Sequence, residues 1–181
     1  DRRQLDQPGL AHRAGVEGGE LRHLGVGGAH EASGVLGLRH VHRIAVDSVP
    51  LQPGPIVIEV FADRAERGVG VDVNHAMLNL ARLNLEKAGI KHFFVREASV
   101  TALPFADRSA DLVTVHQVLH YLDDPASAIA ECARVLKPGG ILLIADFAPH
   151  GREELRTRDA HARLGFSDEQ VGGWFADRDA A

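Results

Sequence analysis

A short apolar run that ends in a carboxylate is the feature that most constrains this chain. The run is residues 69–73, Val-Gly-Val-Asp-Val, and a helix-like segment, residues 74–87, follows it at once. In a parallel sheet, such a strand delivers its last side chain to the carboxyl edge, where Asp72 can accept hydrogen bonds from both hydroxyls of a ribose. The order of strand, carboxylate and helix therefore predicts a site for a small adenosine-containing ligand.

From residue 55 onward, predicted strands alternate with predicted helices. The strands are residues 68–73, 92–95, 111–115 and 141–145, the helices are residues 74–87 and 125–136, and residues 56–62 fit either state. Asn74 and Pro125 are typical helix starts, and Gly89 is a typical helix stop. The alternation predicts an α/β fold, Rossmann-like and doubly wound, with a mostly parallel sheet.

A further helix start is predicted from a capping-box pattern near the end of the sequence. Ser167 and Gln170 stand three residues apart before the apolar Val171. In such a pattern the serine hydroxyl and the glutamine side chain each satisfy a backbone N–H of the first helical turn. The pattern predicts a helix and carries no chemistry.

Composition limits the classes of function. The chain has 181 residues, enough for one sizeable core, and a formal net charge of -5, which gives no basic face for nucleic acid. No apolar run approaches the roughly 20 residues that span a bilayer, so we expect no membrane contact. The single cysteine, Cys132, fits an apolar helix pattern as a small core residue and suits a reducing compartment. We expect a cytoplasmic protein; its oligomeric state cannot be predicted from these features.

Residues 1–55 differ in composition from the rest. They hold ten of the nineteen glycines and five of the eleven histidines, and they lack Lys, Phe, Tyr, Trp, Met and Asn. Such a segment buries little large apolar surface, and its glycines raise the entropic cost of ordering it. We therefore leave residues 1–55 unassigned and treat residues 56–181 as the folded domain. Residues 34–46 fit a strand or a short helix.

Five ordered motifs resemble a class I S-adenosylmethionine-dependent methyltransferase. They are Gly70-Val71-Asp72, Leu103-Pro104-Phe105, Asp111-Leu112-Val113, Asp123-Asp124-Pro125 and the run from Arg134 to Gly140, Arg-Val-Leu-Lys-Pro-Gly-Gly. Their order and spacing together make the resemblance specific, and it covers about residues 56 to 175. Residues 116–120 and 146–150 further resemble methyltransferase domains fused behind winged-helix regulators of the ArsR type.

The resemblance implies S-adenosylmethionine as the cofactor, a small-molecule methyl acceptor, and a set of cofactor-binding positions. That set is Asp72, Val73, Met77, Ser99, Val100, His116 and Gln117. Asp72 matches the acid that binds the ribose, and Val73 matches an apolar residue that packs on the adenine. An alternative role for Asp72 is to stabilise the start of the following helix through its dipole, and both roles are compatible.

Ser99 departs from the family pattern. It occupies the position of an aspartate that binds the adenine amino group, and a hydroxyl accepts a hydrogen bond more weakly than a carboxylate does. Glu97 is a possible substitute, although a strand-end geometry directs its side chain elsewhere. His116 and Gln117 match positions that contact the methionine end of the cofactor, largely through the backbone.

Methyl transfer needs no protein nucleophile, so the resemblance implies no obligatory catalytic residue. A base is needed only where the acceptor must lose a proton, and His120 and His150 are the candidates because imidazole titrates near neutrality. His116 and His120, four residues apart, would form a metal pair on a helix, but no third ligand has matching spacing. The pair His40 and His42 also lacks partners, so no metal site is predicted.

Two elements of the family pattern are missing from the sequence. The first strand and its glycine-rich turn should precede Phe61 by about one helix, yet residues 49–55 there hold three prolines, which obstruct a central strand. The final antiparallel strands should follow Trp174, and the chain ends at Ala181. The alternative functions are therefore an inactive fragment, a ligand-sensing module of the same fold, or an NAD-dependent oxidoreductase, which would bind its ribose through the same carboxylate.

The change of composition near Gly54 suits translation of a GC-rich gene in the wrong frame, because the segment is rich in Arg, Gly, Ala, Val and His. Resequencing of the gene decides whether the segment is frame-shifted or native. A one-base correction that restores a glycine-rich turn after a strand would support a frame shift, and an intact upstream frame would count against it.

Overall fold

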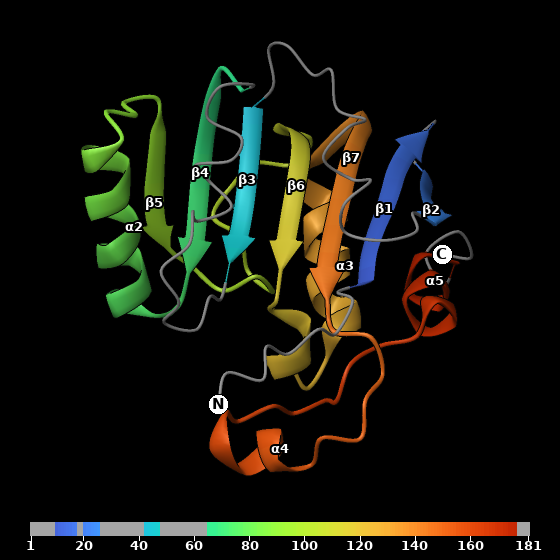
Figure 1. Cartoon of the computed structure of the whole chain (residues 1–181). Coiled ribbons are helices and arrows are strands. Elements are labelled where there is room, and N and C mark those ends of the chain that lie inside the picture. The colour runs from blue at the N-terminus through green and yellow to red at the C-terminus, as the bar shows by residue number, and fades with distance from the viewer. Residues whose placement is uncertain (1–9, 18–19, 26–41, 48–64, 177–181) are drawn as a thin grey trace.

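The structure is a computed structural model that describes residues 10–17, 20–25, 42–47 and 65–176. Its centre is one sheet with the strand order β2-β1-β7-β6-β3-β4-β5 (Figure 1). The strands are β1 Leu10–Glu17, β2 Glu20–Gly25, β3 His42–Asp47, β4 Arg67–Asp72, β5 Phe93–Glu97, β6 Ala110–His116 and β7 Leu136–Asp146. Every pairing from β5 across to β7 is parallel, and β1 pairs antiparallel with both β7 and β2. The predicted α/β fold with a mostly parallel sheet is confirmed.

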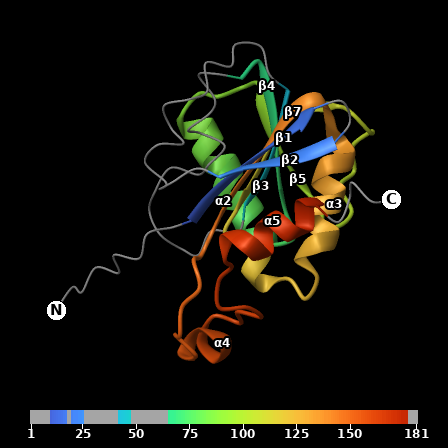
Figure 2. The same ribbon diagram turned by 90° about the vertical axis from the view of Figure 1, so that its right-hand side faces the viewer.

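Helices cover both faces of the sheet, as a doubly wound fold requires. The helices are α2 His75–Lys87, α3 Pro125–Val135, α4 Glu154–Arg158 and α5 Asp168–Ala176, with a 3-10 turn, η2, at Leu119–Tyr121. Figures 1 and 2 show α2 on one face and α3 on the other, with α5 near α3 and β2. None of the helices in the described ranges is long and apolar enough to cross a membrane.

The position of β3 corrects one prediction. The sequence indicated that the first strand of the family pattern was missing, but β3 occupies the centre of the sheet, between β4 and β6. It ends at Asp47, before the prolines of residues 49–55, so these prolines do not interrupt it. The glycine-rich turn would fall within residues 48–64, which lie outside the described residues, as does the undecided segment 56–62. The division of the chain at residue 55 and its frame-shift origin stay predictions.

The antiparallel edge of the sheet also has an unexpected source. The family pattern places its antiparallel strands after the last helix, whereas in this chain β1 and β2 supply the antiparallel pairings beside β7. Both strands come from the glycine-rich and histidine-rich N-terminal part of the sequence. Backbone hydrogen bonding along a strand depends little on side-chain type, so an atypical composition did not reveal these strands.

Local sequence signals located the helix boundaries well. The Oδ1 atom of Asn74 accepts from the backbone N–H of Ala76 at 2.9 Å and of Met77 at 3.4 Å, which caps α2 as predicted. Gly89, just after α2, has φ +68°, a conformation in which a Cβ is strained. The predicted capping box opens α5, because the N–H of Gln170 donates to Ser167 Oγ at 3.2 Å and that of Ser167 donates to Gln170 Oε1 at 3.0 Å.

The main core lies between β6, β7 and α3. The helix buries one apolar face, formed by Ala128, Ile129, Cys132 and Val135, and strands β6 and β7 contribute residues such as Val113 and Leu142. The predicted core position of Cys132 is confirmed, and burial raises the pKa of its thiol to about 12. Helix α3 ends at Val135 and β7 begins at once with Leu136, so the Lys-Pro-Gly-Gly run of residues 137–140 lies within β7 and does not itself end the helix, contrary to the prediction from the sequence. The register of β7 on β6 shifts between Ala110 and Leu112.

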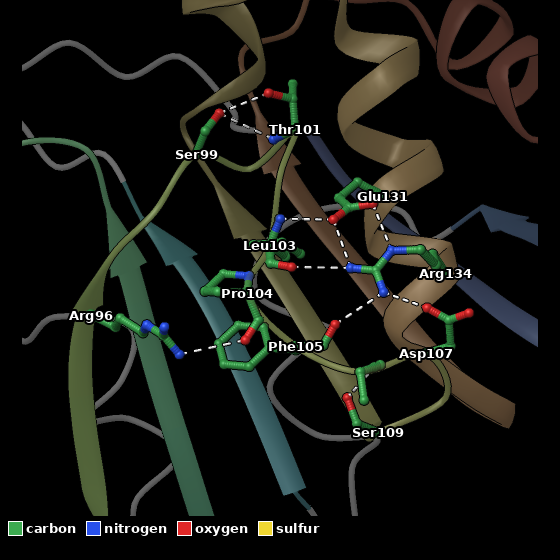
Figure 3. A network of polar contacts seen from close by, with 11 residues as sticks. Arg96, Ser99, Thr101, Leu103, Pro104, Phe105, Asp107, Ser109, Glu131 and Arg134 are labelled. Carbon is green, nitrogen blue, oxygen red and sulfur yellow. Dashed lines mark hydrogen bonds and ion pairs between the residues drawn. The ribbon is translucent and has the colours of Figure 1, made fainter.

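A polar network around Arg134 joins α3 to the loop that follows β5 (Figure 3). The guanidinium donates to the main-chain oxygens of Leu103 and Phe105, both at 3.0 Å, and pairs with Asp107. Two further bonds, of 2.7 and 2.8 Å, join it to Glu131, whose Oε1 also accepts from the N–H of Leu103 at 2.7 Å. The planar guanidinium thus fixes residues 103–107 against α3.

We expect Arg134→Lys to lower the free energy of unfolding by about 1–3 kcal/mol, because an ammonium keeps the charge but cannot satisfy the same fork of acceptors. Urea denaturation measures the change. Arg158→Lys is the matched control, since its guanidinium is 62% exposed and pairs with Asp159 at the surface, so we expect a change below about 0.5 kcal/mol. Equal losses for the two variants would contradict a structural role for the network.

Glu131 should add an acid-sensitive contribution to stability. Its hydrogen bond to Arg134 holds the pKa of Glu131 below its usual value, with a smaller effect from the Leu103 N–H. A carboxyl with a depressed folded-state pKa stabilises the fold above its unfolded pKa, about 4.3, and loses this contribution as the pH falls through the folded value. We expect the free energy of unfolding to fall more steeply below about pH 4.5 in the wild type than in Glu131→Gln, which urea titrations at several pH values measure. Parallel curves would contradict the assignment.

Candidate functional site

The carboxyl ends of the parallel strands meet at one edge of the sheet. Strand register places Asp72 of β4 opposite Glu97 of β5. Across β3, His116 at the end of β6 lies opposite Asp47 and, on its other side, opposite Ala145 of β7. The chain proceeds outward in one direction through β4 and β5, and in the other through β6 and β7. Such a reversal of strand order at β3 is where α/β sheets bind ligands.

Asp72 and Val73 form the β4 side of this edge. The Asp72 Oδ1 atom accepts from the N–H of Asn74 at 2.7 Å, so the carboxylate supports the start of α2 as the alternative role required. Its side chain is half-buried. Val73, next to it, is 66% exposed, which is unusual for a large apolar residue. A carboxylate beside an uncovered apolar side chain fits the ribose and adenine of an adenosine-containing cofactor.

The β5 side is less well suited to an adenine. The Ser99 hydroxyl shares a hydrogen bond of 2.8 Å with Thr101 Oγ1 and accepts from the Thr101 N–H at 3.2 Å, so an adenine amino group would compete with these partners. Val100 is 4% exposed and belongs to the core, which leaves its backbone for a contact. Glu97 points elsewhere, as expected, because its carboxylate lies 3.4 Å from the imidazole of His75. The adenine roles of Ser99 and Val100 stay predictions.

His116 and Gln117 lie at this edge of the sheet, at the carboxyl end of β6. Gln117 has φ 51°, the left-handed conformation, and its N–H donates to Ala145 O at 2.7 Å. Non-glycine residues with this backbone cluster at ligand sites, because the cost of about 1–3 kcal/mol must be offset by the surroundings. Met77 lies half-buried on the first turn of α2. The cofactor roles of His116, Gln117 and Met77 are likewise predictions.

His120 lies near the same edge of the sheet, and its side chain contacts Asp146, the last residue of β7. Its imidazole is 1% exposed, and its Nδ1 atom lies 2.7 Å from Asp146 Oδ1. Asp146 also accepts backbone N–H bonds from Leu119 and Phe147, both at 2.8 Å. The Asp146 carboxylate therefore contacts three nitrogen atoms in a buried position.

Residues 147–166, which include α4, form what we call the cap. Figure 1 shows the cap beyond the carboxyl ends of β6 and β7. Its two ends are joined by backbone bonds, from Phe166 N to Phe147 O at 2.9 Å and from His150 N to Leu164 O at 3.0 Å. Gly165 between them has φ +85°, and a Cβ there would lie 2.1 Å from Ala148 O. Only glycine fits where the two ends of the cap cross.

The cap carries two more histidines toward His120. His161 is 7% exposed, its ring centroid lies 4.3 Å from that of His120, and its Nδ1 atom is buried with no hydrogen-bond partner among the described residues. Burial lowers the pKa of His161, and the neighbouring His120 lowers it further. The Nε2 atom of His150 is also buried without a partner in that part of the chain. Buried polar atoms of this kind require an explanation, such as a ligand or water.

The histidines do not make a metal site in the part of the chain that the structure describes. His116 ends a strand and His120 lies in η2, so the pair does not share a helix face. No group of three His, Cys, Asp or Glu side chains among residues 65–176 is placed to hold a metal ion. His40 lies outside the described residues.

Sequence reasoning missed Asp146, His161 and the ring of Phe147. Asp146 is the last residue of its strand, as Asp72 is of β4, so the criterion that selected Asp72 also applies to it. His161 had no such signal, because only the path of the cap brings it to His120.

The comparisons with known proteins agree with this geometry. A family model described as a methyltransferase domain matches residues 54–144, which is half of the chain. The chain belongs to this family. Its match begins before β4 and extends to Ile144 of β7, so it includes the edge with Asp72 and His120.

Curated relatives of the methyltransferase domain act on several molecules. A demethylmenaquinone methyltransferase of Renibacterium salmoninarum is 36% identical over 115 residues, which are 61% of this chain and 48% of that protein. A ubiquinone biosynthesis O-methyltransferase of Hahella chejuensis is 39% identical over 93 residues, which are 51% of this chain and 39% of that protein. The chain thus spans about half or less of the length of these relatives.

The fold is shared with solved structures. The YcgJ protein of Bacillus subtilis superimposes with a TM-score of 0.68 at 22% identity, over 82% of this chain and 67% of the other. At this identity the likeness shows the Rossmann-like fold alone. Family and fold together imply S-adenosylmethionine as the cofactor, and the carboxylate and exposed valine at the end of β4 fit that molecule.

Replacement of Asp72 tests the cofactor edge. We expect Asp72→Asn to weaken binding of S-adenosylmethionine about tenfold or more, because an amide oxygen is a weaker acceptor for ribose hydroxyls than a carboxylate. Calorimetric titration measures the dissociation constant. Glu86→Gln, which removes an exposed carboxylate near the far end of α2, is the control and should bind as the wild type does. An unchanged affinity in Asp72→Asn would remove Asp72 from the site.

Proposed function

We propose that this chain transfers a methyl group from S-adenosylmethionine to a small-molecule acceptor. The observation that carries the proposal is the half-buried Asp72 carboxylate beside the exposed Val73 at the carboxyl end of β4, next to the reversal of strand order at β3. Membership of the methyltransferase family supports methyl transfer over the NAD-dependent alternative, although the ribose contact would be the same.

A small acceptor is supported by the relatives and by the size of the cap. The two curated relatives are named for menaquinone and ubiquinone biosynthesis, which concern small molecules. The cap beyond the sheet edge has about twenty residues, and its Phe147 and His161 rings pack on His120. The proposed roles of the cofactor-binding residues, from Asp72 to Gln117, follow from this placement, with His120 and His150 beside the acceptor.

A ligand-sensing role is the second candidate. The family model matches residues 54–144, so β3 lies outside the match. The finer resemblance to domains fused with ArsR-type regulators rests on residues 116–120 and 146–150, and these two stretches are in contact through His120 and Asp146. A sensor would bind S-adenosylmethionine without turnover. We also propose a cytoplasmic location, on the strength of the single cysteine.

Methyl transfer is tested with S-adenosylmethionine labelled at its methyl group and small acceptors that carry hydroxyl, thiol or amine groups. We expect the full chain to label at least one acceptor class, and Asp72→Ala to reduce this labelling at least tenfold, because the cofactor is held less well. The Glu86→Gln variant should keep full labelling. Binding without labelling of any acceptor would favour the sensor, and absence of binding would contradict both functions.

A further inference from the structure

Three aromatic rings and one carboxylate surround the imidazole of His120. The ring centroids of Tyr121, His161 and Phe147 lie 4.1, 4.3 and 4.8 Å from that of His120. The Asp146 carboxylate lies 2.7 Å from the Nδ1 atom of His120 and holds the orientation of its ring. The imidazole of His120 is therefore enclosed by three rings and oriented by one carboxylate.

Asp146 fixes which nitrogen of His120 holds the proton in the neutral ring. The carboxylate accepts hydrogen bonds and has none to donate, so the Nδ1 atom that faces it must be the N–H. The lone pair of the neutral imidazole therefore lies on Nε2. This is the arrangement of a general base held by an acid, in which the acid sets the tautomer and stabilises the charge that forms.

His150 has the opposite arrangement. Its Nδ1 atom accepts the N–H of Arg152 at 3.3 Å, so the lone pair lies on Nδ1 and the proton on Nε2. That Nε2–H is buried and has no partner among residues 65–176. His150 can therefore donate a hydrogen bond to a ligand but cannot take a proton at that atom. His120 and His150, the two candidate bases from the sequence, therefore differ in which ring nitrogen can accept a proton.

We propose that the methyl acceptor is a hydroxyl compound, that His120 accepts the hydroxyl proton at Nε2 while Asp146 positions its ring, and that the acceptor lies beneath the cap. This inference rests on the proposed function. The acceptor oxygen forms a bond to the methyl carbon as the carbon–sulfur bond breaks, with that electron pair going to sulfur. The O–H proton moves to His120, and water removes it after the product leaves.

Two other ionisable groups, His161 and Tyr121, lie beside His120. Burial lowers the pKa of the His161 imidazole, and the neighbouring His120 lowers it further. Burial also raises the pKa of the Tyr121 phenol, as do the negative charges of Asp159 and Asp146, so Tyr121 stays protonated. The unpartnered Nδ1 atom of His161 is a polar contact that an acceptor can satisfy.

Entry of an acceptor requires the cap to open, because His120 is 1% exposed. Arg163 holds the cap to η2: its N–H donates to His120 O at 3.0 Å, and its guanidinium donates to the main-chain oxygens of Leu122 and Asp123, at 3.2 and 2.5 Å. The two ends of the cap are bonded to each other, from Phe166 N to Phe147 O, so the cap is a closed loop.

The tautomers are measured first, by long-range ¹H–¹⁵N spectra of the full chain labelled at histidine. We expect His120 to carry its proton on Nδ1 and His150 on Nε2 at a pH where both are neutral. In Asp146→Asn the amide can donate to Nδ1, so His120 should shift toward the Nε2–H form. A wild-type His120 protonated on Nε2 would overturn the proposal, whatever the activity.

The second measurement uses catechol as the hydroxyl probe. His120→Asn keeps an N–H toward Asp146 but has no base at the Nε2 position, so methyl transfer to catechol should fall about 100-fold, while affinity for S-adenosylmethionine stays within twofold. His92→Gln, an exposed residue just before β5 at the opposite edge of the sheet, is the control. Circular dichroism and urea denaturation show whether the variants fold.

The outcomes separate this inference from the proposed function. A wild-type protein that does not bind S-adenosylmethionine contradicts the proposed function and this inference with it. A protein that binds it and methylates only amines or thiols keeps the function and overturns the hydroxyl acceptor. Full transfer to catechol by a folded His120→Asn variant likewise overturns the role of His120 alone.

Discussion

The parallel pairing of β3 with both β4 and β6 is the constraint on which the rest of the structure depends. This pairing brings the carboxyl ends of the strands to one edge and reverses the strand order there. It places Asp72 and Val73 on one side of β3, and His116 on the other. Without a strand in that position, the two halves of the edge would be unrelated parts of the chain. The cofactor side and the acceptor side of the proposed site therefore share one backbone framework.

The carboxylates of Asp72 and Asp146 both lie at strand ends, but their surroundings suit them to different roles. Asp72 is half-buried and supports the first turn of α2, beside the valine side chain that is 66% exposed. Asp146 is 6% exposed, accepts three hydrogen bonds and fixes the ring of a buried histidine. The first environment suits recognition of neutral hydroxyls, and the second suits control of a proton. A reaction that joins a bound cofactor to a protic acceptor needs both.

Local patterns made part of this predictable. The Asn74 cap, the Ser167 capping box and the carboxylate at the end of β4 depend on residues within a few positions of each other, so the sequence located them. The contact of His120 with Asp146 spans 26 positions, and the network of Arg134 with Leu103 spans 31. Neither pair has a spacing rule, because the path of the intervening chain decides whether the side chains meet.

For strand β3, a local pattern led to a wrong prediction. Residues 34–46 fitted a strand or a short helix and the prolines of residues 49–55 argued against a central strand, yet His42–Asp47 pairs with two neighbours along the backbone. The prolines that counted against a strand lie just beyond its end. The prolines thus argue against a strand only at the positions that they occupy.

A crystal structure of the full chain with S-adenosylmethionine tests the central claim most directly. The account predicts both ribose hydroxyls within about 3 Å of the Asp72 carboxylate, the adenine on Val73, and the methyl group directed toward the end of β6 and the cap. A cofactor bound elsewhere on the sheet, or a ribose turned away from Asp72, would contradict it.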